Sequence, residues 1–406
     1  MNVIVIGGGP TGMQAAATAA LNGHKVTLLE QNEKLGKKLY ITGKGRCNIT
    51  NAGGREAFFA NVVRNPRFLY SAWNAFDSAD VQALIGSLGV AVKVERGGRV
   101  FPKSDKSSDV LKALQMRLQR CEVEIRLNAR VQSILTADGR VTGVSLLNQE
   151  LNADAVVLCT GGASYPATGS TGDGYRFARD LGHTVISPKP SLIPLTTAEQ
   201  WPNELAGLTL KNVTLRAFQG SKQVFEELGE MLFAHFGVTG PLVLSASALL
   251  EEPASARLEI DLKPGLSAEQ LERRLLRDLD AAKQKNLRNA LSGLLPHSLL
   301  PIVLEVAGVS AESSASELTR PGRQSLVRTL KALPLTLTGT RPLEEAIITR
   351  GGVSTKEVDP STLESKLVRG LYFAGEVLDV DAQTGGYNLQ IAWSTGTLAG
   401  MLASKR

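Results

Sequence analysis

The sequence predicts an α/β protein in which a Rossmann-type domain is interrupted by an inserted β-barrel domain and a small helical domain. Two features support this prediction. An apolar run at residues 3–6 leads directly into Gly-x-Gly-x-x-Gly and an alanine-rich helix, and a second glycine-rich strand, loop and helix closes the chain. Between them, strand-like alternation begins near residue 191, and helical periodicity follows a capping box at residues 267–270. We therefore expect the Rossmann-type domain to comprise residues 1–190 and 356–406, the barrel residues 191–266 and 333–355, and the helical domain residues 267–332.

The first strand, turn and helix have the pattern of a unit that binds the ADP half of a dinucleotide. Gly7 permits a tight turn, Gly9 lets a pyrophosphate approach the backbone because it has no Cβ, and Gly12 lets the helix pack close to the sheet. The helix N-terminus offers free N–H groups to phosphates. Glu30, at the end of the second strand, can accept hydrogen bonds from ribose hydroxyls and disfavours a 2′-phosphate. The expected contacts of this half are Gly7, Gly9, Pro10, Thr11, Gly12, Glu30 and Gln31.

The C-terminal segment indicates which dinucleotide is bound. An apolar strand at residues 370–374 ends in Gly375 and Glu376, and Gly385–Gln390 then opens the terminal helix. A simple NAD dehydrogenase does not need this second unit, whereas FAD extends to a second site for its ribityl chain and flavin ring. We expect Glu376 to bind hydroxyl groups of the cofactor, and the amides of residues 388–390 to stabilise negative charge on the reduced ring. The predicted domain is therefore a FAD-binding, glutathione-reductase-like Rossmann domain.

Composition limits the classes of function. The 406 residues are 43% hydrophobic and 21% charged, as in ordinary globular proteins, and no apolar run approaches the length of a membrane span. The first strand begins at residue 2, which leaves no room for a signal peptide, so we expect a cytoplasmic protein without membrane contacts. The three cysteines lack a C-x-x-C spacing, and we expect neither a metal site nor a dithiol pair. Cys159 lies in an apolar run and is expected to be a buried core thiol.

The net charge of +6 and a pI near 9.2 permit a nucleic-acid partner, but the positive residues are dispersed and only 5% of residues are aromatic. A local anion site near the pyrophosphate is the more economical interpretation of one basic cluster. Cys47 lies beside this cluster, and the neighbouring positive charge is expected to lower its pKa. Because no second cysteine is within reach in the sequence, we favour packing or flavin contact for Cys47 over redox catalysis. The cluster consists of Lys34, Lys37, Lys38, Lys44 and Arg46.

Several motifs together resemble one family. They are residues 41–51 (Ile-Thr-Gly-Lys-Gly-Arg-Cys-Asn-Ile-Thr-Asn), residues 230–241, Gly351–Val353, Glu364–Lys366, and the run from Gly375 to Asp381 that leads into Gly385–Gln390. Over essentially its whole length the chain resembles the bacterial HI0933-like flavoprotein family, which includes aminoacetone-oxidase-like and bile-acid ene-reductase-like (BaiN-type) members. The resemblance implies non-covalent FAD, a FAD-binding domain interrupted by a β-barrel and a helical domain, and oxidoreductase activity without a fixed substrate. With the glycine-rich loops, it places further FAD contacts at Lys38, Gly43, Gly45, Arg46, Cys47, Asn48, Val131, Thr160, Gly161, Gly162, Gly375, Glu376, Gly386, Asn388, Leu389 and Gln390.

Few residues are candidates for acid–base chemistry. His235 lies in a motif of the resemblance and Tyr387 in the second glycine-rich unit, and for each a role at the flavin competes with a role in packing. Arg46 is a candidate for stabilising the flavin or an anionic substrate. His24 and His183 follow glycines at helix ends and are expected to be surface or capping residues.

Three functions remain open from the sequence. The first is a reductase of an activated C=C bond or ketone, of the bile-acid or steroid-enone kind. Its donor would be NAD(P)H that binds only transiently, because the sequence has no second Gly-x-Gly-x-x-Gly. The second is an oxidase of a small amine or amino ketone such as aminoacetone. The third, which only the basic pI suggests, is a flavin-containing nucleic-acid-associated protein. We expect a small-molecule substrate and do not favour a nucleic-acid partner, and the sequence does not determine the oligomeric state.

Overall fold

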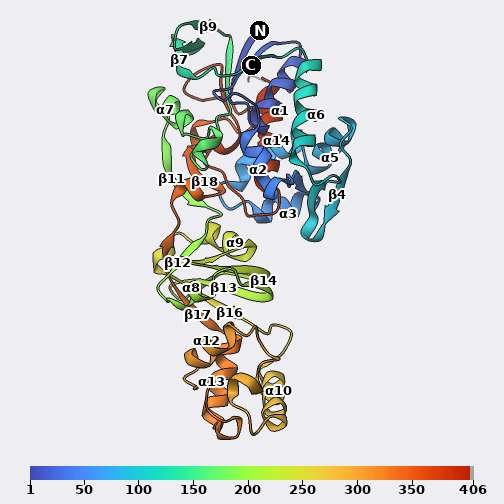
Figure 1. Cartoon of the computed structure of the whole chain (residues 1–406). Helices are drawn as coiled ribbons and strands as arrows, with labels where there is room; N and C mark the ends of the chain where they lie inside the picture. Colours follow the sequence, from blue (N-terminus) through green and yellow to red (C-terminus); the bar gives the residue numbers. More distant parts are fainter. Residues whose placement is uncertain (403–406) are drawn as a thin grey trace. The chain divides into compact units, whose positions relative to one another are not determined.

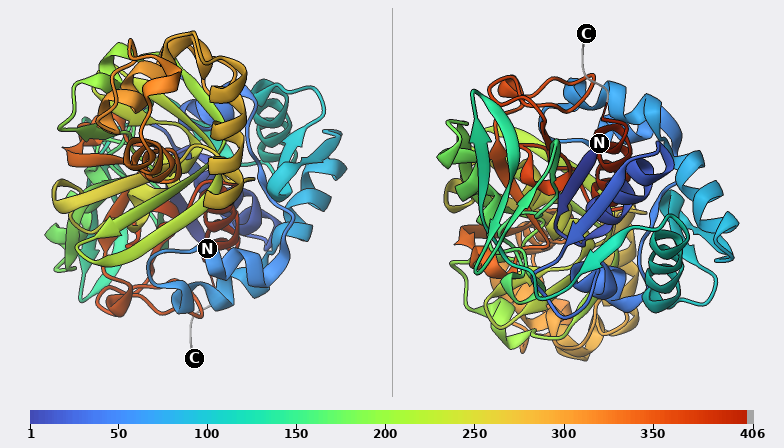
Figure 2. Two further views of the ribbon diagram at one scale, coloured as in Figure 1. Left: turned by 90° about the horizontal axis from the view of Figure 1, so that it is seen from below. Right: turned by 90° about the horizontal axis from the view of Figure 1, so that it is seen from above.

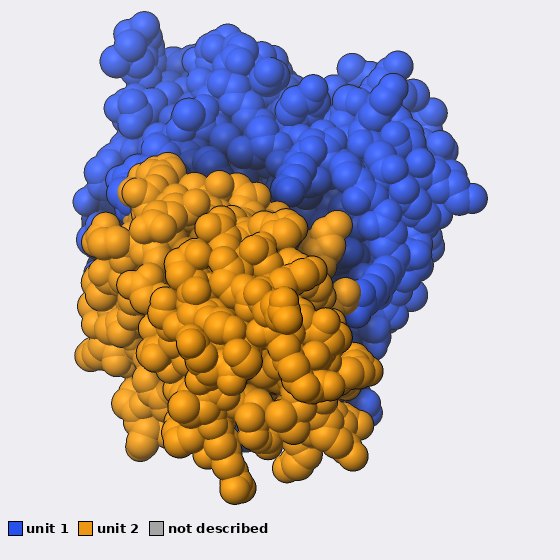
Figure 3. Space-filling model, turned by 60° about the horizontal axis from the view of Figure 1, so that its bottom comes forward, with its two compact units in different colours: residues 1–191, 342–406 blue, residues 192–341 orange. Residues whose placement is uncertain are grey.

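The computed structural model describes residues 1–402 and separates them into two compact units (Figure 3). Unit 1 combines Met1–Ser191 with the C-terminal part of the chain from Pro342. Unit 2 is Leu192–Arg341. The two ends of the sequence therefore build one unit together.

The chain returns to unit 1 earlier than the sequence indicated. We expected the inserted barrel to continue through residue 355. Instead β18 (Ile348–Val353) pairs antiparallel with β11 (Val185–Ser191) in a two-stranded sheet, which places residues 342–355 in unit 1. The boundary between a barrel and a helical domain inside unit 2 stays a prediction.

Unit 1 is built on a five-stranded sheet in the order β6 (Glu124–Arg126), β2 (Lys25–Leu29), β1 (Asn2–Ile6), β10 (Ala155–Leu158), β19 (Leu371–Phe373). Every neighbouring pair is parallel, so all five strands end at the same edge. Strands of a parallel sheet are covered on both faces, which explains the continuous apolar runs of β1 and β10. In the view from above, Figure 2 shows the dark red C-terminal helix beside the blue strands of this sheet.

Two helices of unit 1, α1 (Pro10–Leu21) and α14 (Tyr387–Gly400), pack against each other (Figure 1). Small residues permit their close approach. A Cβ added at Gly396 or Gly400 would lie 2.6 or 2.5 Å from a backbone carbonyl oxygen of α1. Larger side chains at these two positions would therefore force the helices apart.

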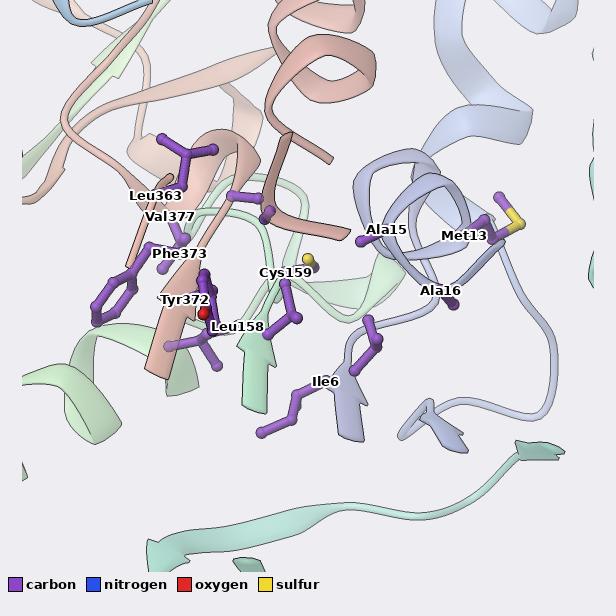
Figure 4. Packing of buried hydrophobic residues seen from close by; sticks show 14 of the residues in the cluster. Ile6, Met13, Ala15, Ala16, Leu158, Cys159, Leu363, Tyr372, Phe373 and Val377 are labelled. Carbon is purple, nitrogen blue, oxygen red and sulfur yellow. The ribbon is translucent and has the colours of Figure 1, made fainter. Parts of the chain in front are cut away.

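The core of unit 1 is continuous across the sheet and α1 (Figure 4). Ile6, Leu158 and Phe373 come from three neighbouring strands, and Ala15 faces them from the helix. All four are at most 5% exposed. The prediction for Cys159 is confirmed, because it is buried in the same cluster, and burial raises its pKa.

Smaller elements surround this sheet. Two three-stranded antiparallel sheets contain β3 (Thr50–Asn51), β5 (Arg99–Pro102) and β4 (Val92–Glu95), and β7 (Val131–Ala137), β8 (Arg140–Leu146) and β9 (Glu150–Asn152). The helices are α2 (Lys37–Gly45), α3 (Gly54–Asn61), α4 (Tyr70–Ala75), α5 (Ser78–Ser87), α6 (Ser107–Arg120) and α7 (Asp173–Asp180). The segment of residues 31–55 contains α2, which buries Leu39, and β3, which pairs with β5. Residues 31–36 and 46–49 of this segment are irregular, and the backbone of residues 42–44 within α2 is not helical.

Unit 2 contains a closed barrel with the strand order β12 (Leu195–Thr197), β15 (Gly237–Thr239), β14 (Lys222–Ala234), β13 (Thr209–Gln219), β16 (Ala256–Asp261), β17 (Leu333–Thr340). Its helices are α8 (Trp201–Glu204), α9 (Pro241–Leu249), α10 (Ala268–Ala281), α11 (Leu287–Ala290), α12 (Leu299–Val306) and α13 (Arg320–Lys331). The predicted capping box is present, because the Ser267 hydroxyl accepts the Gln270 N–H at the start of α10. Across residues 1–402, no helix has the length and apolar character needed to cross a membrane.

Candidate functional site

The candidate site lies where the parallel strands of unit 1 end. In open parallel sheets, ligands bind outside the carboxyl ends of the strands, next to the helix that follows. Gly7 follows β1, Cys159 follows β10 and Gly375 follows β19. The segments are in contact, since the Cys159 N–H donates to Ile6 O and a Cβ at Gly375 would collide with the Thr11 hydroxyl.

The three motif glycines occupy three different environments. Gly7 has φ +103°, and a Cβ there would lie 2.5 Å from the carbonyl oxygen of Cys159. A Cβ at Gly12 would collide with the carbonyl oxygen of Gly7. At Gly9, in contrast, no described atom other than those of Gly9 and its two chain neighbours lies within 4 Å of where its Cβ would be. Gly7 and Gly12 are therefore needed by the fold itself, whereas Gly9 faces open space of the kind a pyrophosphate needs.

The first turn of α1 supplies the donors for this space. The Met13 N–H donates to Gly9 O, the first bond of the helix. The N–H groups of Thr11 and Gly12 precede it and have no partner within the helix, while Pro10 has no N–H to satisfy. They point along the positive end of the helix dipole, which favours a phosphate.

Glu30 lies at the end of β2 and is 7% exposed. Its Oε2 accepts the Gly8 N–H at 2.7 Å, and its Oε1 accepts the N–H and the side-chain Nδ2 of Asn32 at 2.8 and 2.7 Å. A carboxylate can accept about four hydrogen bonds, so one position remains for a ribose hydroxyl. Gln31 beside it donates to Gly169 O at 2.6 Å, and its side chain is used to hold that turn.

Two predicted cofactor residues from opposite ends of the sequence meet at this edge. Lys38 Nζ lies 2.8 Å from Glu376 Oε2 and donates to Ser164 Oγ at 2.8 Å. Glu376 Oε1 also accepts the Thr349 N–H at 2.8 Å. A Cβ at Gly162 would lie 2.5 Å from the Thr349 hydroxyl and 2.9 Å from Glu376, so only glycine fits there. Ser164 and Thr349 were missed from the sequence because no motif marks them.

A second glycine-rich region surrounds the start of α14. Gly386 has φ +101°, and a Cβ there would collide with the carbonyl oxygen of Thr50. Asn51 Nδ2 donates to Gly385 O at 3.0 Å and to Gly97 O at 2.9 Å, so one side chain fixes two glycine loops. Asn51 is part of the motif at residues 41–51 but was not predicted as a site residue.

The α14 N-terminus requires one correction. We expected the amides of residues 388–390 to face the flavin. The Gln390 N–H donates to Gly386 O at 3.0 Å, because it is the first amide that can form a helical bond. The side chain of Gln390 is also occupied, since it accepts from Thr50 Oγ1 and donates to Phe76 O. The backbone amides of Asn388 and Leu389 remain as donors, while the Asn388 side chain bonds to Ala382 at both its atoms.

Two predicted contacts carry polar atoms that this chain leaves unpaired. Asn48 Oδ1 and Thr160 Oγ1 are buried, and neither has a hydrogen-bond partner among residues 1–402. Unpaired buried polar atoms are rare in native proteins unless a ligand or water satisfies them. Together with the space at Gly9 and the two helix N-termini, they fit an extended dinucleotide.

The predicted anion cluster is not formed as a whole. Lys37 pairs with Glu33, Lys38 pairs with Glu376, and the Arg46 guanidinium lies 2.5 and 2.6 Å from two carboxylates. Those carboxylates belong to Glu95 and Asp105, and Arg46 also lies 4.1 Å over the Phe101 ring. The structure thus neutralises three of the five charges with acids that are distant in sequence or, for Lys37, four residues away.

The prediction for the Cys47 pKa was wrong. Cys47 is fully buried, and burial raises its pKa to about 12 although Arg46 is its neighbour in sequence. A buried thiol at this pKa is neutral and unreactive, which agrees with the packing role. Gly43 and Gly45 flank the same bend with φ of +58° and +83°.

The remaining predicted residues are scattered. Val131 begins β7 and is 4% exposed, and Tyr387 is the first residue of α14 and 8% exposed. His235 lies in unit 2, exposed in the turn between β14 and β15 with its ring 4.9 Å from that of Phe236. His183 was expected to be a surface or capping residue. It is 4% exposed rather than at the surface, but its Nδ1 lies 3.3 Å from Ala178 O in the last turn of α7 and its Nε2 2.7 Å from Ser365 Oγ, and burial lowers its pKa.

A buried carboxylate near the second glycine region was also missed. Asp381 is 0% exposed and accepts a hydrogen bond from Ser191 Oγ at 2.8 Å. Arg64 Nε lies 4.0 Å away. Burial raises the pKa of Asp381 to about 6 despite this positive charge. The motif that contains Asp381 gave no signal that it would be buried.

Comparisons with known proteins agree with this architecture. The family model for the HI0933-like protein Rossmann domain matches residues 1–402. The chain is 36% identical over 411 residues to a 3-dehydro-bile acid delta(4,6)-reductase of Clostridium scindens, covering 99% of this chain and 98% of that protein. It is 31% identical over 412 residues to a ribosomal RNA dihydrouridine synthase of Haemophilus influenzae, covering 99% and 98%.

A solved structure shows the same fold at low identity. The 3-ketosteroid-delta4-(5alpha)-dehydrogenase of Rhodococcus jostii RHA1 superimposes with a TM-score of 0.53 and 17% identity, covering 100% of this chain and 96% of that one. The prediction of the fold class is confirmed by the family model and by this likeness. The chain therefore belongs to the HI0933-like family, a family of flavin-dependent oxidoreductases.

Proposed function

We propose that this chain binds FAD non-covalently and reduces a carbon–carbon double bond conjugated to a carbonyl group. The observation that carries the proposal is that unit 1 contains two helices with glycine-rich N-termini, α1 and α14, that pack against each other. The open space at Gly9 and the start of α1 suit a pyrophosphate, and the start of α14 suits a flavin ring. The 36% identical relative is named as a reductase of a bile acid, which supports this reaction class.

The residues of the chain would bind and orient the cofactor. The amides of Thr11 and Gly12 would hold the pyrophosphate, and the free position on Glu30 would accept a ribose hydroxyl. Bound FAD supplies the hydride chemistry. The α14 N-terminus, with the amides of Asn388 and Leu389, would stabilise negative charge at the ring.

The source of electrons in this proposal is NAD(P)H that binds transiently. The sequence contains a single Gly-x-Gly-x-x-Gly, which the FAD half would occupy. A second dinucleotide would then have to share the substrate side of the flavin and leave before the substrate binds. This order predicts a ping-pong cycle.

A second candidate substrate is a uridine in RNA. The Haemophilus influenzae relative is named as a ribosomal RNA dihydrouridine synthase. The C5=C6 bond of uracil is conjugated to a carbonyl, as in a steroid enone, so the same flavin chemistry serves both. The charge distribution favours this candidate as well. Unit 2 has sixteen Lys/Arg and sixteen Asp/Glu residues, so the whole net charge of +6 belongs to unit 1.

The test follows the flavin absorbance of the purified protein without oxygen. Addition of NADH or NADPH is expected to bleach the flavin, and a steroid 4-en-3-one or protein-free ribosomal RNA is then expected to restore its colour. Dihydrouridine in the RNA is measured by mass spectrometry of nucleosides. A protein that neither carries nor takes up flavin contradicts the cofactor proposal. Bleaching by aminoacetone rather than by either nucleotide favours the oxidase alternative.

A further inference from the structure

Around the hairpin of β4 and β5, some positively charged side chains of unit 1 have carboxylate partners and others do not. Arg46 and Lys93 contact the carboxylates of Glu95 and Asp105 at 2.5–3.4 Å. The tip of the hairpin, residues 96–99, has no such partner. Arg96 and Arg99 are exposed, and no carboxylate in the described part of the chain lies within 4.0 Å of either guanidinium. The hairpin tip therefore presents two guanidinium groups that have no carboxylate partner, although Arg99 Nε donates to Arg96 O at 3.1 Å and the Arg99 guanidinium lies 5.9 Å from the centre of the Phe101 ring.

A cluster of aromatic rings and one arginine lies on α3 and α4. The Arg55 guanidinium lies 5.4 Å from the ring centre of Phe59 and 5.3 Å from that of Tyr70. Arg55 also donates to Asn74 Oδ1 at 2.9 Å, which fixes its orientation. Tyr70 is 42% exposed, although its ring contacts that of Phe59 edge-on at 4.7 Å. A large ring held in place and left open to solvent is a platform on which another planar group can stack.

The two features are joined by backbone contacts. The Ala52 N–H donates to Gly98 O at 2.7 Å, which ties the hairpin tip to the residues that precede α3. The Asn51 side chain donates to Gly97 O and to Gly385 O, so it connects the hairpin tip to the loop at the start of α14. β3, which precedes α3, also pairs with β5, so the hairpin and the segment leading into α3 belong to one sheet. The free arginines and the aromatic cluster thus border the region proposed for the flavin ring.

We propose that this arginine–aromatic surface, formed by Arg55, Phe59, Tyr70, Arg96 and Arg99, binds single-stranded RNA beside the site of reduction. The arginines contact backbone phosphates, and Tyr70 stacks on a base. Proteins that bind single strands combine these two elements, free cations along the backbone path and aromatic side chains under the bases. A steroid needs neither, since it has no phosphates and no planar aromatic base. The inference rests on the RNA branch of the proposed function.

The test measures RNA binding by the intact flavoprotein and does not need turnover. The probe is a fluorescein-labelled oligouridylate of about 20 nucleotides, long enough for several contacts. Fluorescence anisotropy gives the binding constant between about 50 and 200 mM KCl. Each phosphate contact contributes about 0.7 to the slope of log K against log salt, so the Arg96→Ala/Arg99→Ala protein is expected to lose about 1.4. Tyr70→Ala is expected to weaken binding about tenfold, while Tyr70→Phe keeps it.

A matched control variant distinguishes RNA binding at this surface from a general effect of removing positive charge from unit 1. Lys112 and Arg120 are exposed on α6 and have no ion-pair partner in residues 1–402, so Lys112→Ala/Arg120→Ala removes the same charge elsewhere on unit 1. The control is expected to keep the wild-type slope. Equal slopes for the two double variants, or wild-type protein that does not bind the oligonucleotide, overturn the inference. Flavin content and bleaching by NAD(P)H are measured on the same samples. If NAD(P)H bleaches the flavin but the protein does not bind RNA, only the proposed RNA-binding surface is refuted. If NAD(P)H does not bleach the flavin, the proposed reductase activity is refuted.

Discussion

Gly9 offers a direct test of where the cofactor lies. It has φ −74° and ψ −177°, an extended conformation that any residue adopts, and no described atom beyond Gly9 and its two chain neighbours lies within 4 Å of its Cβ position. Replacement by valine should change the stability of the apoprotein by no more than about 1 kcal/mol. The same side chain would intrude on a pyrophosphate held by the first turn of α1. Overpacking of this kind costs about 1–3 kcal/mol, which weakens FAD binding roughly 5- to 150-fold.

The assay compares two quantities on the same variants. Apoprotein is titrated with FAD for affinity, and the melting temperature without FAD reports the fold. Gly86→Val is a control, because Gly86 also has open space at its Cβ and no positive φ. Gly12→Ala is the opposite case, since its Cβ collides with Gly7 O and the apoprotein itself should be destabilised. Wild-type FAD affinity in Gly9→Val would refute the placement of the pyrophosphate.

Three further predictions follow from single residues. Glu376→Gln should weaken FAD binding about tenfold by removing a charged acceptor, and an unchanged affinity in the same titration would contradict its role. Burial raises the pKa of Cys47 to about 12, so Cys47 should resist iodoacetamide at about pH 8 in the native protein and react only after unfolding. The partly exposed Cys121 should react first, and intact-mass analysis measures how many cysteines have been modified. The pKa of Asp381 is about 6 in the folded protein, above its unfolded value. The contribution of Asp381 to the free energy of unfolding is therefore greatest at low pH and is lost as pH rises through about 6. Asp381→Asn should therefore gain about 1 kcal/mol relative to wild type between about pH 5 and 7.5 in urea unfolding, and no pH-dependent difference would show that the buried charge is fully compensated.

The parts of the structure that the sequence predicted well are those with local causes. The turn after β1 depends on the φ of Gly7 and on contacts of Gly12 within a few residues, so the motif alone was sufficient. The basic cluster failed for the opposite reason. Lys38 is neutralised by Glu376, which is 338 residues away in the sequence. No sequence pattern near Lys38 indicates this partner. The pKa of Cys47 failed because neighbouring charge is visible in a sequence, whereas burial is a property of the fold.

The net charge shows the same limit in a different way. Along the sequence the positive residues are dispersed, and this argued against a nucleic-acid partner. The fold gathers the excess into unit 1, because the balanced segment from Leu192 to Arg341 forms a unit of its own. The inserted segment has equal numbers of positive and negative residues, so it hides the positive excess when the whole sequence is considered. The excess becomes evident when the two units are counted separately.

Two relatives with full-length similarity are named for substrates as different as a bile acid and ribosomal RNA. Similarity over the whole chain therefore does not determine the substrate, because both names are compatible with the proposed FAD site and with reduction of a conjugated double bond. The choice must come from groups outside the cofactor site. A steroid is recognised by an apolar cavity, whereas an RNA strand needs free cations and stacking surfaces along its path. Arg96, Arg99 and the Arg55–Tyr70 cluster meet the second requirement and have no evident use in the first. The salt dependence of binding at this surface is thus the measurement that separates the two substrates.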